Sequence, residues 1–263
     1  MSPMRTLLAG LAAVLVCASA PSNAKAAETV KLKVGFSPNH LGASTTILVS
    51  FAIQSNTSAL PSPLTNFNLG LPRGMGLGIT TLGEVTCVRP GLEAQGVSGC
   101  SGNSLMGLGE AVADVEFGSE ILEERAQITL LMGPPVEHHT TLLFFADAQT
   151  PAVDEEIFQG QLLPGAGPNS AQLTTAIPIM ATVPDGPDVS IVAMHSSLGP
   201  RGVTYHRFVN GKRAAYTPIG MTVPNVCPRG GWLFAATFTF LDGSAVTATS
   251  RVACPRARER ARH

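Results

Sequence analysis

The stretch before the C-terminal tail shows the clearest alternation of apolar and polar positions. From Trp232 to Phe240 every second residue is aromatic or alanine, and threonine occupies several positions between them. A period of two is typical of a strand with one buried face. A second alternating run follows the turn sequence Asp-Gly, so the stretch from Cys227 to Cys254 predicts a β-hairpin.

Two loop lengths are possible for this hairpin, and they pair its strands differently. A two-residue Asp-Gly loop places Phe238 opposite Thr247. A three-residue loop with a left-handed glycine places Phe238 opposite Val246 and Trp232 opposite Val252. Because a shift of one residue exchanges the faces of a strand, the better apolar match favours the three-residue loop.

The rest of the chain shows the same pattern in shorter runs separated by turns. Strands are predicted at 29–36, 44–54, 111–117, 127–132, 140–146, 157–163, 172–183, 189–196 and 204–217. Residues 119–125 are expected to form one helical turn or an acidic loop, and Gly133-Pro134-Pro135 is expected to end the strand 127–132. A type I′ turn is expected at Asn210-Gly211, and no long amphipathic helix is found. We expect an all-β, antiparallel, β-sandwich-like fold of two disulfide-stapled modules that meet near Thr150 to Asp154, with one continuous domain as the alternative.

The N-terminus reads as an export signal. A basic Arg5 precedes the apolar run 7–20, and Ala24-Lys25-Ala26 fits a cleavage site, so 1–26 is predicted to be a signal peptide. No later segment is long and apolar enough to cross a membrane. The modules are then 27–150 and 151–255, the basic tail 256–263 is expected to be disordered, and we expect a secreted or cell-envelope location.

Four cysteines remain after the predicted cleavage, and they allow three pairings. The simplest joins neighbours in sequence: Cys87 with Cys100, and Cys227 with Cys254. Each bridge is expected to add roughly 3 kcal/mol by restricting the unfolded chain, and disulfides suit an oxidising compartment. A metal site built from all four is disfavoured, because no C-x-x-C pair is present.

Charge is nearly balanced overall and uneven along the chain. Residues 110–156 hold eleven acids and one base, whereas 201–263 hold ten bases and two acids. The simplest interpretation is two solvated faces. The alternative is a cation-binding acidic patch and a basic patch that contacts an extracellular or cell-surface polymer or protein. A net charge of −1 gives no general case for nucleic acid.

A cysteine- and glycine-containing segment resembles part of a known group. Cys87 is followed about a dozen residues later by C-x-x-x-S-x-x-G-x-G, formed by Cys100, Ser104, Gly107 and Gly109. Over residues 44–117 the chain resembles a group of uncharacterised secreted bacterial all-β, β-sandwich-like proteins. The resemblance implies disulfide-stapled β modules, and it implies no activity.

Residues that could bind a metal lie around the proposed boundary. Two histidines are adjacent, and an acidic cluster follows them: His138, His139, Asp147, Asp154, Glu155 and Glu156. Neighbouring residues on a strand point to opposite faces, so both histidines could hold one ion only from a loop. The cluster lacks the calcium-loop pattern, so weak calcium binding is the most that is expected and no cofactor is predicted.

No nucleophile or phosphate-loop motif is complete. Gly96-Val97-Ser98-Gly99 and Gly102-Asn103-Ser104 approach G-x-S-x-G and fail it. The leading hypothesis is therefore a non-enzymatic exported or cell-envelope protein with a binding or structural role. The alternative is an exported metal-dependent or other hydrolase that uses His138, His139 and the carboxylates near Asp147.

Overall fold

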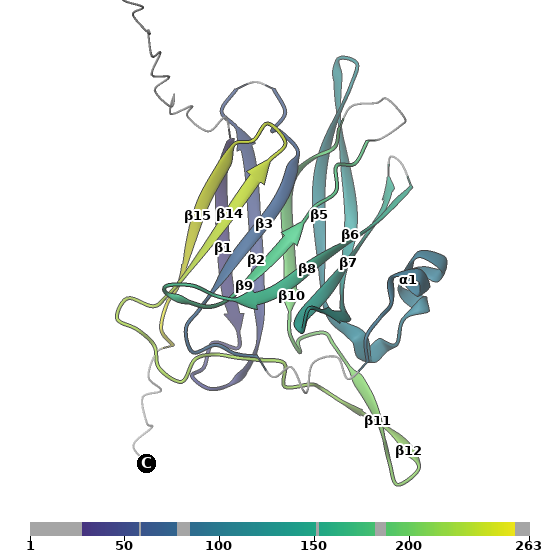
Figure 1. The fold of residues 1–263 in the computed structure, drawn as a ribbon, viewed down its shortest axis with the longest axis vertical. Helices are drawn as coiled ribbons and strands as arrows, with labels where there is room; N and C mark the ends of the chain where they lie inside the picture. The colour runs from purple at the N-terminus through teal and green to yellow at the C-terminus, as the bar shows by residue number, and fades with distance from the viewer. Residues whose placement is uncertain (1–27, 58, 78–84, 151–152, 182–187, 256–263) are drawn as a thin grey trace, which may run out of the picture.

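The protein is all-β in the part that the computed structural model describes, residues 28–57, 59–77, 85–150, 153–181 and 188–255 (Figure 1). The predicted signal peptide and basic tail lie outside these residues. The strands are β1 (Glu28–Ser37), β2 (Ser44–Ser55), β3 (Leu64–Pro72), β4 (Gly76–Leu77), β5 (Leu105–Phe117), β6 (Glu120–Val136), β7 (His139–Thr150), β8 (Asp154–Pro164), β9 (Asn169–Ala176), β10 (Ser190–Leu198), β11 (Tyr205–Val209), β12 (Lys212–Tyr216), β13 (Met221–Thr222), β14 (Trp232–Phe240) and β15 (Ala245–Val252). The helical pieces are α1 (Arg89–Gln95) and two 3₁₀ turns, Gly96–Gly99 and Gly102–Ser104.

One antiparallel sheet of 13 strands forms the body of the molecule. Its order is β15-β14-β3-β9-β8-β7-β6-β5-β10-β2-β13-β4, and β1 pairs with β2. The two sides of this path meet where β1 lies beside β15 (Figure 1). There the Val34 amide donates to Ser250 Oγ at 2.9 Å, and Ser244 Oγ donates to Glu28 Oε2 at 3.1 Å. The result is a nearly closed, barrel-like sheet.

This architecture corrects the expectation of two sandwich-like modules. The expected boundary near Thr150 to Asp154 falls between β7 and β8, which are neighbours in the same sheet. Strand β3 pairs with β9 on one side and β14 on the other, so early and late parts of the chain are interleaved. The sequence pattern gives the strands but not their partners, and the long-range pairings make one sheet.

The C-terminal hairpin has the predicted three-residue register. Phe238 lies opposite Val246 and Trp232 opposite Val252. The Phe240 amide bonds to the Ser244 carbonyl at 3.0 Å, and the loop glycine has a φ of 81°. The aromatic face is buried, with Trp232 only 1% exposed and Phe238 fully buried, so the choice of loop length is confirmed.

The Asn210-Gly211 turn is also confirmed. Both residues have positive φ, 50° and 75°, and Val209 pairs with Lys212. The β11–β12 hairpin forms a separate two-stranded sheet that projects away from the body (Figure 1). Phe208 near its end is 79% exposed.

Two local predictions around β6 were wrong. Residues 119–125 were expected to form a helical turn or an acidic loop, but from Glu120 onward they belong to β6, which pairs with β5. Gly133-Pro134-Pro135 was expected to end the strand 127–132. Instead β6 continues to Val136, because a register shift after Gly133 accommodates both prolines.

Buried aromatic side chains fill one side of the barrel-like sheet. Phe238 packs edge-on against Phe51 at 5.1 Å between ring centroids and lies 5.2 Å from Phe67. Phe36 contacts the rings of Trp232 and Phe234 in the same way. A smaller cluster on the outer face includes Leu92 of α1 with residues of β6, β7 and β8, so the helix covers this part of the sheet.

Both cysteine pairs lie at disulfide distance, as the local pairing predicts. The Cα–Cα separations are 5.1 Å for Cys87–Cys100 and 5.8 Å for Cys227–Cys254. The first pair is anchored to the sheet because the Cys87 amide donates to the Met132 carbonyl at 2.8 Å. The second spans the base of the β14–β15 hairpin.

Removing the hairpin disulfide should destabilise the protein measurably. The double variant C227S/C254S releases a loop that spans 27 residues in sequence, and loop-closure entropy predicts a loss of about 3 kcal/mol in the free energy of unfolding. Urea unfolding of both proteins under non-reducing conditions measures the difference. An unchanged midpoint would show that the bridge does not restrict the unfolded chain.

Candidate ligand-binding cavity

The histidines predicted as metal ligands lie far from the carboxylates predicted to join them. His138 sits in the tight turn between β6 and β7, with a φ of 65°, and His139 begins β7. Asp147 lies eight residues further along β7, about 26 Å away at the rise of a strand. The described residues contain no group of three His, Cys, Asp or Glu that could hold a metal.

The acidic cluster is divided between the two faces of the sheet. Asp147 and Glu155 are directly opposite each other on β7 and β8, whereas Asp154 and Glu156 occupy the alternate positions. Alternate residues of a strand point to opposite faces. Asp154 and Glu156 line an internal cavity, and Asp147 and Glu155 are not among its lining residues.

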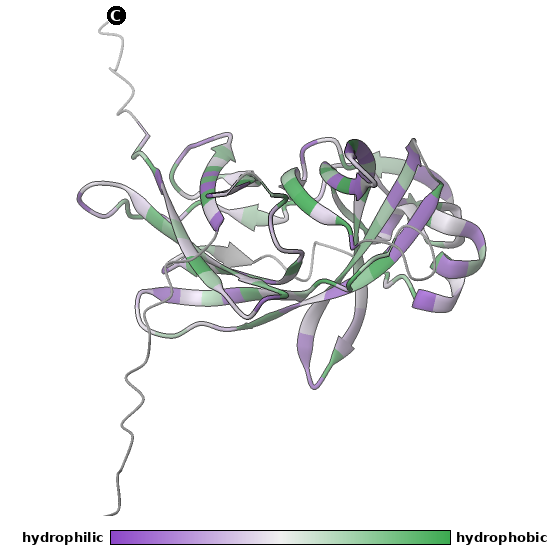
Figure 2. Ribbon diagram, turned by 90° about the horizontal axis from the view of Figure 1, so that it is seen from above, coloured by the Kyte–Doolittle hydropathy of each residue, from purple (hydrophilic) through white to green (hydrophobic). Residues whose placement is uncertain are grey.

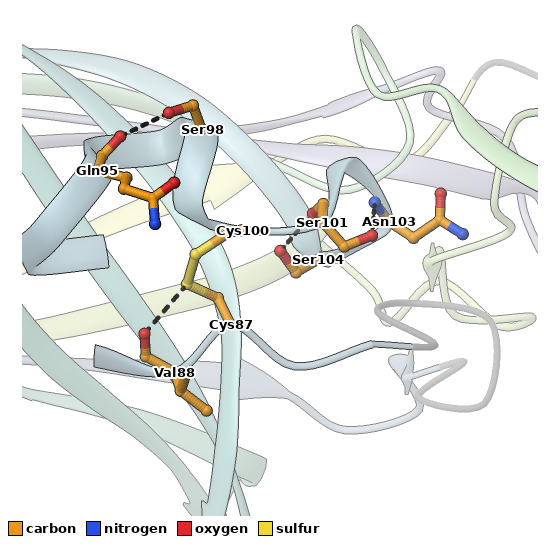
Figure 3. The surroundings of a disulfide bond; sticks show 8 residues. All are labelled: Cys87, Val88, Gln95, Ser98, Cys100, Ser101, Asn103 and Ser104. Carbon is orange, nitrogen blue, oxygen red and sulfur yellow. Dashed lines mark hydrogen bonds between the residues drawn. A yellow bond between two sulfur atoms is a disulfide. The ribbon is translucent and has the colours of Figure 1, made fainter. Parts of the chain in front are cut away.

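The serine and glycines of the C-x-x-x-S-x-x-G-x-G segment have structural positions. Fully buried Ser104 donates to the Ser101 carbonyl at 2.6 Å and closes a 3₁₀ turn beside the Cys87–Cys100 bridge (Figure 3). An added Cβ on Gly107 would lie 1.8 Å from the Ser197 carbonyl oxygen. Because Gly107 has no side chain, the start of β5 can pair closely with β10.

The barrel-like sheet encloses a cavity of about 130 Å³. Figure 2 shows the same strands from above, coloured by the hydropathy of each residue. The side chains that line it are mainly aliphatic, aromatic and thioether groups from nine strands and the segment between β9 and β10. They are Ile47, Val49, Phe51, Phe67, Leu69, Leu71, Met106, Ala111, Ala113, Glu124, Ala126, Ile128, Leu130, Met132, Thr140, Leu142, Phe144, Ala146, Ala148, Asp154, Glu156, Phe158, Leu162, Leu173, Thr175, Ile177, Met180, Val189, Ile191, Met194, Ser196, Leu198 and Met221.

Small inward-facing residues explain why space remains on this side of the sheet. Ala111 of β5 pairs directly with Ala126 of β6, which pairs with Ala148 of β7. Ala113 and Ala146 occupy the neighbouring inward positions. Alanine side chains on three adjacent strands cannot reach across the interior. The larger aromatic residues on the opposite side of the sheet fill the interior next to them.

Methionine is concentrated around the cavity. The chain has six methionines after residue 27, and five of them line it: Met106, Met132, Met180, Met194 and Met221. The sixth, Met75, is buried elsewhere in the core. Methionine is flexible and polarisable, so it adapts to occupants of different shape.

Three carboxylates line the half of the cavity nearer the starts of β6 and β8. Glu124 is on β6, and Asp154 and Glu156 are on β8, close to where β6 and β8 begin and β7 ends. Asp154 is exposed, Glu156 is half-buried and Glu124 is only 8% exposed. The exposed Asp154 carboxylate shows that this half of the cavity wall reaches solvent at the start of β8.

The environment of Glu156 disfavours its negative charge. Burial raises the pKa of its carboxyl above the usual value, and the charge of nearby Asp154 raises it further. Arg89 of α1 acts in the opposite direction but does not cancel these effects. The carboxyl therefore lies in a position where an additional positive charge would be stabilising.

A polar atom also lies deep in the cavity. Thr175 of β9 is 2% exposed, and among the described residues its hydroxyl has no hydrogen-bond partner. The hydroxyl lies over Gly160 of β8, where an added Cβ would come within 2.8 Å of it. The hydroxyl is therefore on the inner face of the sheet, beside the cavity.

The alternation of apolar and polar residues along the chain does not by itself predict this cavity. Glu124 belonged to a segment expected to be helical or a loop, which hid its inward position. The alternating alanines of β5, β6 and β7 were the available signal, because small residues at inward positions of consecutive strands leave space between them. Recognising them requires knowing which strands are neighbours.

Comparisons with known proteins give no further identification. No family model, no curated protein and no solved structure matches the chain. Among the described residues, no helix is long and apolar enough to cross a membrane.

Proposed function

We propose that this is an exported, non-enzymatic protein that binds a compact apolar molecule in the cavity of its barrel-like sheet. The observation that carries the proposal is the cavity of about 130 Å³ with an almost entirely apolar wall and one acidic end. A dry apolar cavity of about 150 Å³ can hold a benzene molecule. An occupant of about one ring, extended toward the acidic end, fits these dimensions.

An unfilled cavity inside the barrel-like sheet lowers the stability of the protein. Protein interiors are normally packed as densely as organic crystals. At about 24 cal/mol per Å³, an empty cavity of 130 Å³ costs on the order of 3 kcal/mol. A ligand that fills it recovers part of this energy through contacts with the wall and through removal of its own apolar surface from water.

The composition of the wall favours binding over catalysis. The described residues that line the cavity include no His, Cys, Lys, Arg or Tyr. General acid–base and nucleophilic catalysis most often depend on such side chains beside a reacting group. The carboxylates lie at one end, where they can orient a ligand, and apolar groups surround the remainder.

Export agrees with the leader pattern at 1–26 and with two cysteine pairs at bonding distance. The resemblance to secreted bacterial all-β proteins supports the same compartment. An exported carrier or sensor of small apolar molecules would use a stapled sheet as a rigid container. In this proposal the binding partner is a small molecule and not the extracellular or cell-surface polymer or protein that the charge pattern suggested.

Methionine methyl groups provide a direct test of cavity binding. In protein labelled with ¹³C at the methionine methyls, benzene should shift several signals from the five cavity methionines and leave Met75 unchanged. Benzene is neutral, so the result does not depend on the carboxylates. A titration in which no cavity methionine responds would overturn the proposal.

A cavity-filling variant gives the matched comparison. Ala126→Leu should weaken benzene binding at least fivefold, because the larger side chain occupies the space. Ala215→Leu on β12 is the control, because Ala215 is exposed and outside the cavity. Equal weakening by both variants would contradict binding at this site.

A further inference from the structure

The β11–β12 hairpin has a fixed base and an outer half that projects away from the body (Figure 1). At the base, fully buried Tyr205 donates its hydroxyl to the Leu105 carbonyl at 2.8 Å. The Asn103 side chain forms two hydrogen bonds with the backbone of His206, each at 2.8 Å. From Tyr205 the chain extends to the turn at Asn210, about 17 Å at the rise of a strand. The base therefore holds the tip in a defined direction.

The outer half of the hairpin exposes apolar side chains. Phe208 is 79% exposed, the largest exposed fraction of any large apolar residue that the structure describes, and neighbouring Val209 is 44% exposed. Phenylalanine is normally among the buried residue types. Apolar groups that gather on a surface within a polar rim are typical of sites that contact a protein or a membrane. The tip is therefore a candidate contact surface.

Basic side chains surround these apolar groups. Phe208 pairs across the strands with Arg213, and Val209 pairs with Lys212. Directly opposed residues of two strands share a face, so each apolar group has a cation beside it. Arg207, two residues before Val209, is also exposed. The tip is a small apolar surface edged by three cations.

The cations at the tip lack acidic partners among the described residues. The chain has five Lys or Arg residues and no acid between 201 and 241. The ion pairs of the described residues involve none of Arg207, Lys212 and Arg213. The acidic residues of β6 and β8 lie where these strands begin, at the end of the sheet opposite the hairpin. The hairpin therefore carries positive charge that suits an anionic surface.

We propose that the tip of the β11–β12 hairpin docks onto an anionic lipid bilayer. Phe208 and Val209 enter the interface between headgroups and acyl chains, and the three basic side chains contact lipid phosphates. Such binding strengthens with buried apolar area and with attraction to anionic lipids. Long basic side chains can keep their charge at the surface while apolar neighbours enter. A polyanionic polymer would match the cations but would offer Phe208 no apolar environment, so the exposed ring favours the bilayer.

Vesicle sedimentation tests the proposal. It uses the chain without the predicted signal peptide 1–26, so that the apolar run of that segment does not contribute. At low salt, vesicles of phosphatidylcholine with about one-third phosphatidylglycerol should bind the protein at least tenfold more tightly than vesicles of phosphatidylcholine alone, because only the first are anionic. Added salt should weaken this binding, because mobile ions screen exposed charges.

Two substitutions separate the apolar contact from the general effect of losing a side chain. Phe208→Ala should weaken binding to the anionic vesicles at least fivefold, because the ring no longer enters the interface. Ile121→Ala is the control, because Ile121 is 57% exposed near the start of β6, at the opposite end of the sheet. It should change the affinity by less than about twofold.

Two double variants separate the position of the charges from the net charge. K212Q/R213Q should weaken binding to the anionic vesicles at least tenfold, because two cations are lost at the contact. K31Q/K33Q removes the same number of charges from exposed positions on β1 and should stay within about twofold of the unchanged protein. All variants keep the basic tail, so differences between them report the hairpin.

The possible results distinguish a bilayer from other partners. Binding to anionic vesicles that Phe208→Ala leaves unchanged, together with equally tight binding to dextran sulfate, would assign the cations to a polyanionic polymer and overturn the proposal. Equal weakening by the two double variants, or no binding to anionic vesicles, would also overturn it. The cavity is tested separately, because benzene binding should be the same in Phe208→Ala as in the unchanged protein.

Discussion

Phe238→Ala should lower the free energy of unfolding by about 4 kcal/mol. The side chain is fully buried, and its ring contacts those of Phe51 and Phe67 at centroid distances of 5.1 and 5.2 Å. Truncating a buried phenylalanine removes its transfer free energy and leaves a new cavity, with a typical cost of 3–5 kcal/mol. Aromatic pairs add to this cost. Urea unfolding followed by far-UV circular dichroism measures the change.

Phe208→Ala is the matched control for this experiment. Phe208 is 79% exposed on the β11–β12 hairpin, so its removal should change stability by less than about 0.5 kcal/mol. The difference between the two stability losses therefore reports the burial of Phe238, because the same side chain is removed in both variants. A loss below 1 kcal/mol for Phe238→Ala would mean that the aromatic side of the sheet is not packed as described.

Gly107→Ala should be at least as damaging. An added Cβ would lie 1.8 Å from the Ser197 carbonyl oxygen and 3.2 Å from the Leu198 Cα, both in the backbone of β10. A backbone atom held in a ladder cannot move aside as a side chain can. The β5–β10 pairing must therefore open locally, and we expect a loss of about 4 kcal/mol or more. Thermal unfolding and the yield of folded protein provide the measurement.

Gly35→Ala separates this contact from the general effect of adding a methyl group. Gly35 lies within β1, and no heavy atom is within 4 Å of its added Cβ. Replacing glycine there reduces the freedom of the unfolded chain, so stability should stay the same or rise slightly. If Gly35→Ala and Gly107→Ala lose stability equally, close approach of β5 and β10 is not the cause.

Local features of this fold followed from local sequence. The parity of aromatic positions between Trp232 and Phe240 determined the register of the last hairpin, because only one loop length matches the two apolar faces. Asn210-Gly211 determined another turn for a similar reason. Both cases depend on residues within about 25 positions of each other, and no distant partner is needed to decide them.

The candidate site could not be predicted in the same way. Glu124 and Glu156 line the same cavity because β6 and β8 both flank β7, and the wall opposite comes from β2, β3 and β10. The histidine–carboxylate hypothesis failed geometrically for a related reason, since His139 and Asp147 share a strand and lie near its two ends. His139 and Asp147 are close in sequence but far apart in space, whereas Glu124 and Glu156 are far apart in sequence but line one cavity.

Folding of this chain is complete only when β1 meets β15. Val34 and Ser250 are 216 residues apart, and the hydrogen bond between them needs both ends of the chain. Contacts of high sequence separation form slowly, because a long loop must be closed first. Strand β1 is synthesised long before β15. The edge of β1 that β15 will cover therefore stays open to other chains until the end of the chain has been made. A chain shortened before β15 would keep that edge exposed and should associate with itself.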